Sequence, residues 1–122
     1  MSDAVVIRTE RGWAGHFIAA ESCSFRRNTL LERGEQRVVV STVGCYRGPS
    51  DRIESIGFER YYETMVFRAK WDDPYWEADV SQRLSFDSRW AIDRVDWQSD
   101  ADANAMHEGV VEEMSAKLAA GQ

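Results

Sequence analysis

The stretch at residues 60–67 constrains the fold most, because it is the longest aromatic and β-branched run without a breaker and lies mid-chain. In a β-strand, successive side chains alternate between the two faces of the sheet. One face would carry Tyr61, Glu63, Met65 and Phe67, and the other would carry Arg60, Tyr62, Thr64 and Val66. Neither set is purely apolar. We therefore expect one face to pack in a core and the other to form a wall of arginine and phenol groups.

Signals of further strands lie on both sides of this stretch. Residues 36–43 contain a valine run with little polarity on either face, which predicts a centrally placed strand closed by Gly44. A hairpin turn is predicted at residues 32–35, just before that strand. Shorter strands are expected at residues 4–9, 52–56 and 77–80, separated by turns at residues 48–51 and 71–76.

The segment that begins at Ser99 has the clearest helical pattern. Ser99 can cap the first turn, and Asp100 and Asp102 suit the positive end of a helix. An apolar stripe recurs at three- and four-residue steps: Ala103, Met106, Val110, Met114 and Leu118. The fold class that we predict is α+β, with a mostly antiparallel twisted sheet and a C-terminal amphipathic helix, in a single domain spanning residues 1–122.

Charge is distributed unevenly along the chain. Residues 1–70 carry eleven Arg and Lys against nine Asp and Glu, whereas residues 71–122 carry four against twelve, and the net charge is −6. The field of an acidic protein repels the phosphate backbone, so we expect no binding to duplex DNA. No apolar stretch approaches the ~18 residues of a membrane span, and the first residues do not resemble a signal peptide. We therefore expect a cytoplasmic protein without membrane contact.

Metal-binding and catalytic motifs are weak. Cys23, Cys45, His16 and His107 have spacings that match no common zinc site, so we predict no metal. His107 followed by Glu108 lacks the second histidine of a zinc-protease motif, and we interpret His107 as a structural or interface residue. The sequence contains no convincing constellation of acid, base and nucleophile. We therefore expect a protein that is not an enzyme, without catalytic residues or a cofactor.

Arginine and aromatic residues carry the strongest binding signal. Thirteen of the fifteen basic residues are Arg, whose planar fork grips phosphate and stacks on flat rings, although a GC-rich genome explains the same bias. Residues 25–28 combine a ring for stacking, forks for phosphate and an amide for a base edge; the alternative is a solvated arginine pair. If this segment is extended, Arg26 and Asn28 share one face and Arg27 lies on the other.

The aromatic residues of two other segments have two open interpretations. Trp13 and Phe17 lie beside glycines, where they would form either a stacking platform or a packed turn. Phe86 and Trp90 would either line the core or face a ligand. The candidate ligand-binding residues are Trp13, Phe17, Arg26, Arg27, Asn28, Arg60, Tyr62, Phe86 and Trp90.

Five blocks of this sequence resemble a family of small phage proteins, the first-described anti-Thoeris sponges. The blocks are residues 11–17, 25–31, 40–44, 60–67 and 106–108. The resemblance implies an immune-evasion protein that binds the glycocyclic ADP-ribose made by a bacterial TIR-domain protein and sequesters it without cleaving it. It also implies a homo-oligomer, a dimer or larger.

The resemblance further implies a pocket in which a ring stacks on adenine and polar groups hold ribose and pyrophosphate. By position and chemistry, Phe86 or Trp13 would supply the ring, Arg60 with Arg26 and Arg27 would hold the phosphates, and Asn28 would contact a hydroxyl or base edge. Relatives are expected to capture cyclic di- or trinucleotides through basic residues on their terminal helices. Here Lys117 is the only base of that helix, which disfavours such a second site.

The competing hypothesis belongs to another functional class. An anti-CRISPR-like inhibitor would use the acidic C-terminal half to mimic nucleic acid and bind a host defence protein. The uneven charge favours this interpretation, but it leaves the arginine-rich and aromatic half without a role.

Overall fold

The fold is described from a computed structural model. It describes residues 5–11, 23–48, 53–54, 61–72, 75–85, 91–92 and 99–121. Seven strands and one helix lie in these ranges: β1 (Ile7–Glu10), β2 (Cys23–Arg33), β3 (Gln36–Arg47), β4 (Ile53–Glu54), β5 (Tyr62–Asp72), β6 (Tyr75–Ser85), β7 (Ala91–Ile92) and α1 (Ser99–Ala119). The chain therefore has the expected α+β composition.

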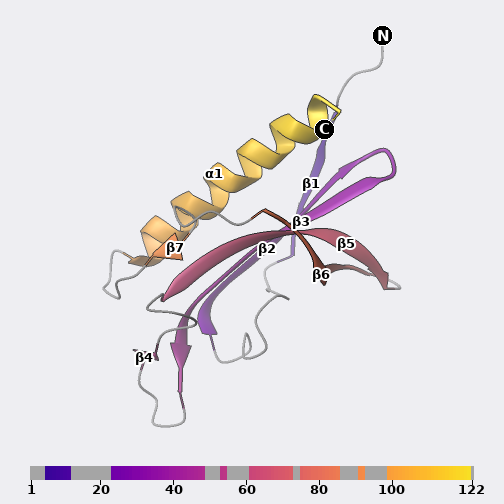
Figure 1. The fold of residues 1–122 in the computed structure, drawn as a ribbon. Coiled ribbons are helices and arrows are strands. Elements are labelled where there is room, and N and C mark those ends of the chain that lie inside the picture. Colours follow the sequence, from indigo (N-terminus) through magenta and orange to yellow (C-terminus); the bar gives the residue numbers. More distant parts are fainter. Residues whose placement is uncertain are drawn as a thin grey trace.

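The strands form one sheet in the order β1-β2-β3-β5-β6, and every described pairing is antiparallel. The short strands β4 and β7 pair with β3 and β5, respectively. Figure 1 shows long, bent strands with α1 lying across one side of the sheet. We call this side the helix face. The other side, which α1 does not cover, we call the open face, although its central residues such as Val39, Ser41 and Val43 are buried. Among the described residues, no helix has the length and apolar character needed to cross a membrane.

The main core lies between α1 and the helix face. It consists of Leu31, Val38, Val40 and Val66 from the strands and Val110, Val111, Met114 and Leu118 from the helix. Burying each such side chain contributes ~1.5–3 kcal/mol, which outweighs the ~1 kcal/mol that Gly109 costs inside the helix. The predicted apolar stripe faces this core, and the amphipathic helix is confirmed.

Strand β3 is the central strand of the sheet, as its valine run predicts. Val38, Val40 and Thr42 point to the helix face, while Val39, Ser41 and Val43 point to the open face, and all six are buried. The expectation that Gly44 closes this strand is wrong, because β3 continues to Arg47. Just after Gly44, the backbone of the strand is irregular. Cys45 there has a φ of 54°, and it is the one described non-glycine residue with a positive φ.

The other strand predictions agree with the sheet in position but differ in length. Gly34 and Glu35 form the predicted hairpin turn, with Gly34 at φ 59°, where glycine avoids a Cβ clash. The segment expected at residues 77–80 is the longer strand β6, and β5 extends well beyond residue 67. The predicted alternation in β5 is confirmed: Tyr62, Thr64 and Val66 lie on the helix face.

Gly44 lies beneath the ring of Tyr62, its partner across the β3–β5 pair. A Cβ at this position would come within 2.0 Å of the Tyr62 ring. We predict that Gly44→Ala lowers the free energy of unfolding by about 1–3 kcal/mol, because the ring or the strand has to move. Urea denaturation measures this change.

Gly109→Ala is the matched control for this variant. Gly109 is an exposed helical residue, and a Cβ there would meet nothing within 4 Å. We expect this variant to gain about 1 kcal/mol, because alanine is the better helix former. Equal effects of the two substitutions would contradict the packing that we describe at Gly44.

Candidate functional site

A buried polar seam joins α1 to the helix face of the sheet. It consists of His107 and three threonines from adjacent strands, Thr29, Thr42 and Thr64, all fully buried. The Nε2 atom of His107 lies 2.7 Å from Thr29 Oγ1, and its Nδ1 atom lies 2.6 Å from Thr42 Oγ1. Thr42 Oγ1 lies 2.6 Å from Thr64 Oγ1. The seam therefore satisfies both ring nitrogens without water.

The donor of each hydrogen bond in this seam can be assigned, one bond after another, starting from Glu10. Thr29 has one hydroxyl proton and donates it to the Glu10 carboxylate at 2.7 Å, which only accepts when ionised. His107 Nε2 must then carry a proton and donate to Thr29, so that Nδ1 accepts a proton from Thr42. Thr64 in turn donates to Thr42. Neutral His107 with the proton on Nε2 is the form that completes this chain.

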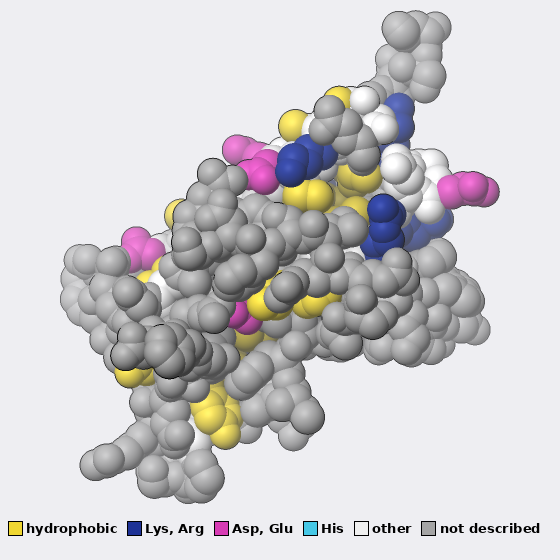
Figure 2. Space-filling model, in the orientation of Figure 1, with side chains coloured by type: hydrophobic (Ala, Val, Ile, Leu, Met, Phe, Trp, Pro, Cys, Tyr) yellow, Lys and Arg dark blue, Asp and Glu magenta, His cyan; other side chains and the backbone are white. Residues whose placement is uncertain are grey.

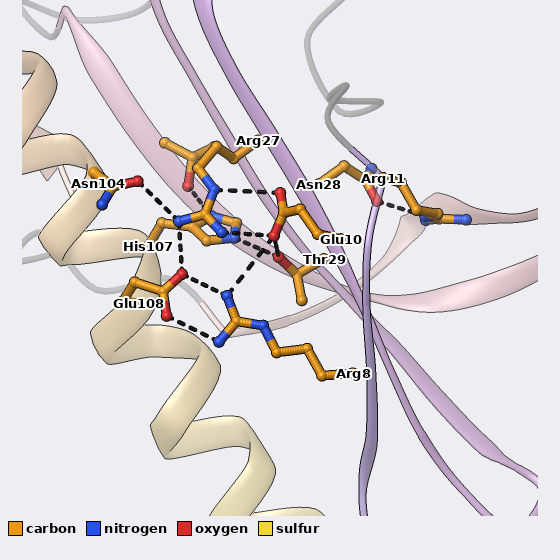
Figure 3. A network of polar contacts seen from close by, with 10 residues as sticks. Arg8, Glu10, Arg11, Arg27, Asn28, Thr29, Asn104, His107 and Glu108 are labelled. Carbon is orange, nitrogen blue, oxygen red and sulfur yellow. Dashed lines mark hydrogen bonds and ion pairs between the residues drawn. The ribbon is translucent and has the colours of Figure 1, made fainter.

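Two arginines and two glutamates form an ion-pair cluster above the seam (Figure 3). Glu108 of α1 accepts bonds from Arg8 at 2.9 and 2.5 Å and contacts Arg27 at 2.7 Å. Arg27 also donates to Glu10 at 2.6 and 3.2 Å and to Asn104 at 2.9 Å. The pKa of Glu108 is lowered to about 2. The hydrogen bonds from Arg8 contribute most and the bond from Arg27 contributes less, while burial opposes the change. The cluster thus fixes α1 over β1 and β2.

The buried bonds of His107 outweigh these ion pairs energetically. Solvent-exposed ion pairs contribute about 0.2–1 kcal/mol each, whereas a buried polar group left without its partner costs about 1–3 kcal/mol. Burial, with smaller contributions from Arg27 and Arg8, lowers the pKa of His107 to about 4, while Glu10 and Glu108 oppose this change. His107 is therefore a structural residue, as its sequence context predicts.

The seam makes stability depend on pH. The unfolded chain protonates His107 near pH 6.5, whereas the folded chain does so only near pH 4. Between these values the unfolded state binds more protons, so stability falls as the pH is lowered, and the full loss is on the order of 3 kcal/mol. Above pH 6.5 this contribution is constant. Urea denaturation at several pH values measures the slope.

His107→Gln is the control for this slope, because glutamine can bond to threonine hydroxyls but does not titrate. We expect the variant to lose most of the slope between pH 6.5 and pH 4. Identical slopes in the variant and the wild type would show that His107 is not buried in its neutral form.

Tyr62 belongs to a second polar contact on the helix face, near the start of α1. Its hydroxyl donates to Asp100 Oδ1 and lies 2.5 Å from Cys45 Sγ. Its ring meets Phe25 edge-on, with centroids 5.9 Å apart. Burial raises the pKa of Cys45 and raises that of Cys23 to about 11, so both thiols stay protonated. These contacts commit Tyr62 to the fold.

The open face carries a different polar group, which we call the polar row: Arg11, Arg26, Asn28, Ser41 and Glu63. Asn28 Oδ1 accepts a bond from Arg11 Nε at 2.8 Å, and the backbone N–H of Arg11 donates to the carbonyl of Asn28 at 2.7 Å. Asn28 and Ser41 are partners across β2 and β3. Arg26 is exposed, whereas Asn28, Ser41 and Glu63 are buried. Two arginines therefore share one face of the sheet with three buried polar side chains.

The structure separates the predicted binding residues that it describes. Arg26 and Asn28 share the open face, whereas Arg27 and Tyr62 lie on the helix face and have partners within the chain. Trp13, Phe17, Arg60, Phe86 and Trp90 lie outside the described residues. Among the described residues, no group of three His, Cys, Asp or Glu side chains could hold a metal ion.

The proposed row includes residues that the sequence analysis did not select. Ser41 could have been found, because a two-residue turn at Gly34 fixes the register that pairs it with Asn28. Glu63 could not, because its place depends on the long-range pairing of β3 with β5. Comparisons with protein-family models, curated proteins and solved structures find no match.

Proposed function

We propose that this protein binds a nucleotide second messenger of the cyclic ADP-ribose class on its open face and sequesters it without cleavage. The observation that carries the proposal is the polar row, in which Arg11 and Arg26 adjoin Asn28 on the side of the sheet away from α1. In this role the protein would be a phage-encoded inhibitor of bacterial immunity. The sequence resemblance supports the same function.

The chemistry of the polar row suits a nucleotide better than a simple anion. Guanidinium groups bind phosphate with paired hydrogen bonds. The amide, hydroxyl and carboxylate of the row are buried, and they would match ribose hydroxyls or the amine of a base once a ligand displaces what covers them. Hydrogen bonds to charged groups contribute about 1.5–3 kcal/mol each, and base stacking on an aromatic ring adds about 1–3 kcal/mol. Several such contacts together reach the ~12 kcal/mol of nanomolar binding.

Arg27 and Tyr62 are left out of this proposed site. Both lie on the helix face, on the other side of the sheet from the polar row, so neither can join that row in one site. A phosphate contact of Arg27 would compete with Glu10 and Glu108, which already bind its guanidinium.

A capture experiment tests the proposed function. The protein is incubated with glycocyclic ADP-ribose, separated from unbound ligand and denatured, and the released compound is analysed by mass spectrometry. Recovery of intact ligand supports sequestration. Recovery of an altered ligand would indicate an enzyme instead, and absence of capture would favour the protein-binding inhibitor.

The acidic side chains that the structure describes add no support for that competing inhibitor. On the face shown in Figure 2, the acidic side chains of the described residues are scattered rather than gathered in one patch. Glu108, an acidic residue of α1, is already bound by Arg8 and Arg27. Mimicry of nucleic acid would need a contiguous acidic surface.

Two exposed arginines on opposite faces provide a matched pair of variants. Arg26 belongs to the open face, and Arg68 follows Val66 on the helix face, opposite Val38. We predict that Arg26→Ala weakens capture at least tenfold, the effect of losing about 1.4 kcal/mol, whereas Arg68→Ala leaves it unchanged. Isothermal titration calorimetry measures both affinities. Equal affinities of the two variants would place the site elsewhere.

A further inference from the structure

The ring of His107 faces charged groups on one side and uncharged groups on the other. Four charged side chains influence its titration, and all belong to β1, β2 or α1: Arg8, Glu10, Arg27 and Glu108. The Nε2 atom faces this cluster through Thr29, whose hydroxyl donates to Glu10. The Nδ1 atom faces β3 and β5, where Thr42 and Thr64 supply hydroxyl groups. The two ring nitrogens therefore respond differently to an added proton.

Protonation of the ring adds a proton at Nδ1, because Nε2 already carries one. Thr42 gives its single hydroxyl proton to Nδ1 and accepts the proton of Thr64. With a proton on Nδ1, two donors would face each other across this contact. Reversing both threonines would deprive the buried hydroxyl of Thr64 of its acceptor, Thr42. Protonation therefore breaks the bond to β3, whereas Nε2 keeps its bond to Thr29 of β2.

The ion pairs of Glu108 hold α1 to β1 and β2 under the same acidic conditions. Glu108 binds Arg8 at 2.5 Å and Arg27 at 2.7 Å. Its pKa is lowered to about 2, whereas the pKa of His107 is about 4. Between these two values, the carboxylate of Glu108 is ionised while His107 is protonated. Glu10 and Glu108 also favour the protonated ring, so the charge of His107 is attracted toward β1.

We propose that His107 is an acid switch that moves α1 away from β3 and β5 while β1 and β2 retain the helix. In the neutral state, the bonds to Thr29 and Thr42 hold α1 over both β2 and β3. In the acid state, the imidazolium turns toward Glu10 and Glu108, and the bond to Thr29 and the ion pairs keep the helix attached. Histidine suits this role because a small change in its surroundings changes the pH at which it gains its charge. The switch acts on the helix face and does not depend on ligand binding at the open face.

The two buried cysteines can report on the position of α1. Cys45 lies on β3 in one cluster with Ala103 of α1, and its thiol lies 3.4 Å from Asp100 in the first turn of the helix. Cys23 is the matched reference, since it is also buried but its thiol bonds to the backbone of Gly44 within the sheet. Movement of α1 alone exposes Cys45, whereas unfolding of the whole chain exposes both thiols.

Labelling of the two native thiols tests the switch in the wild-type chain. Pulses of dithiodipyridine, a disulfide that reacts with thiols even in acid, are applied at neutral pH and at about pH 3, between the pKa values of His107 and Glu108. Peptide mass spectrometry measures both cysteines, and each rate is divided by that of free cysteine at the same pH. One pH unit below its pKa, protonated His107 outnumbers the neutral form about ten to one. We therefore expect the relative rate of Cys45 to rise about tenfold and that of Cys23 to stay unchanged.

His107→Gln is the control, because glutamine does not titrate, and we expect it to keep Cys45 protected in acid. Exposure of Cys45 by acid in this variant would assign the response to another group and overturn the proposal. In the wild type, equal exposure of Cys23 and Cys45 would show that the whole chain unfolds, and protection of both would show that α1 does not move. Either result overturns the proposal without reference to the variant and whatever the outcome of the capture experiment.

Discussion

The hydrogen bonds of His107 are the interaction on which the arrangement of helix and sheet depends. One buried ring joins α1 to Thr29 of β2 and Thr42 of β3, and Thr64 of β5 extends the chain of bonds. Because each donor in this chain has one possible direction, the ring is held as the neutral form with its proton on Nε2. A hydrophobic contact could bury α1 at several rotations and shifts, whereas these bonds allow one.

The arginines have different roles on the two faces of the sheet. On the helix face, Arg8 and Arg27 bind Glu10 and Glu108 and hold the helix against β1 and β2. On the open face, Arg11 binds Asn28 while Arg26 remains exposed. Adjacent residues 26 and 27 of one strand therefore serve different purposes, since a pleated strand turns consecutive side chains in opposite directions. This division is what limits the proposed ligand site to the open face.

Strand β3 contributes to both faces and so connects the core with the polar row. Val38, Val40 and Thr42 pack toward α1, and Ser41 lies on the other side beside Asn28. Near its end, the positive φ of Cys45 brings the thiol toward Tyr62 and Asp100 on the helix face. The same irregularity lets the strand run past Gly44, where the Tyr62 ring leaves no space for a side chain.

The sequence by itself determined the local elements: the apolar stripe of α1, the valine-rich strand β3, the hairpin turn at Gly34 and the alternation that separates Arg26 from Arg27. These follow from periodicities and backbone preferences that act over a few residues. Only the tertiary structure decided that His107 would be buried against threonines, that Glu108 would pair with Arg8, and that Glu63 would lie on the same face as Asn28. Those contacts join residues far apart in the chain, and the alternation of one strand does not indicate which partner covers either of its faces.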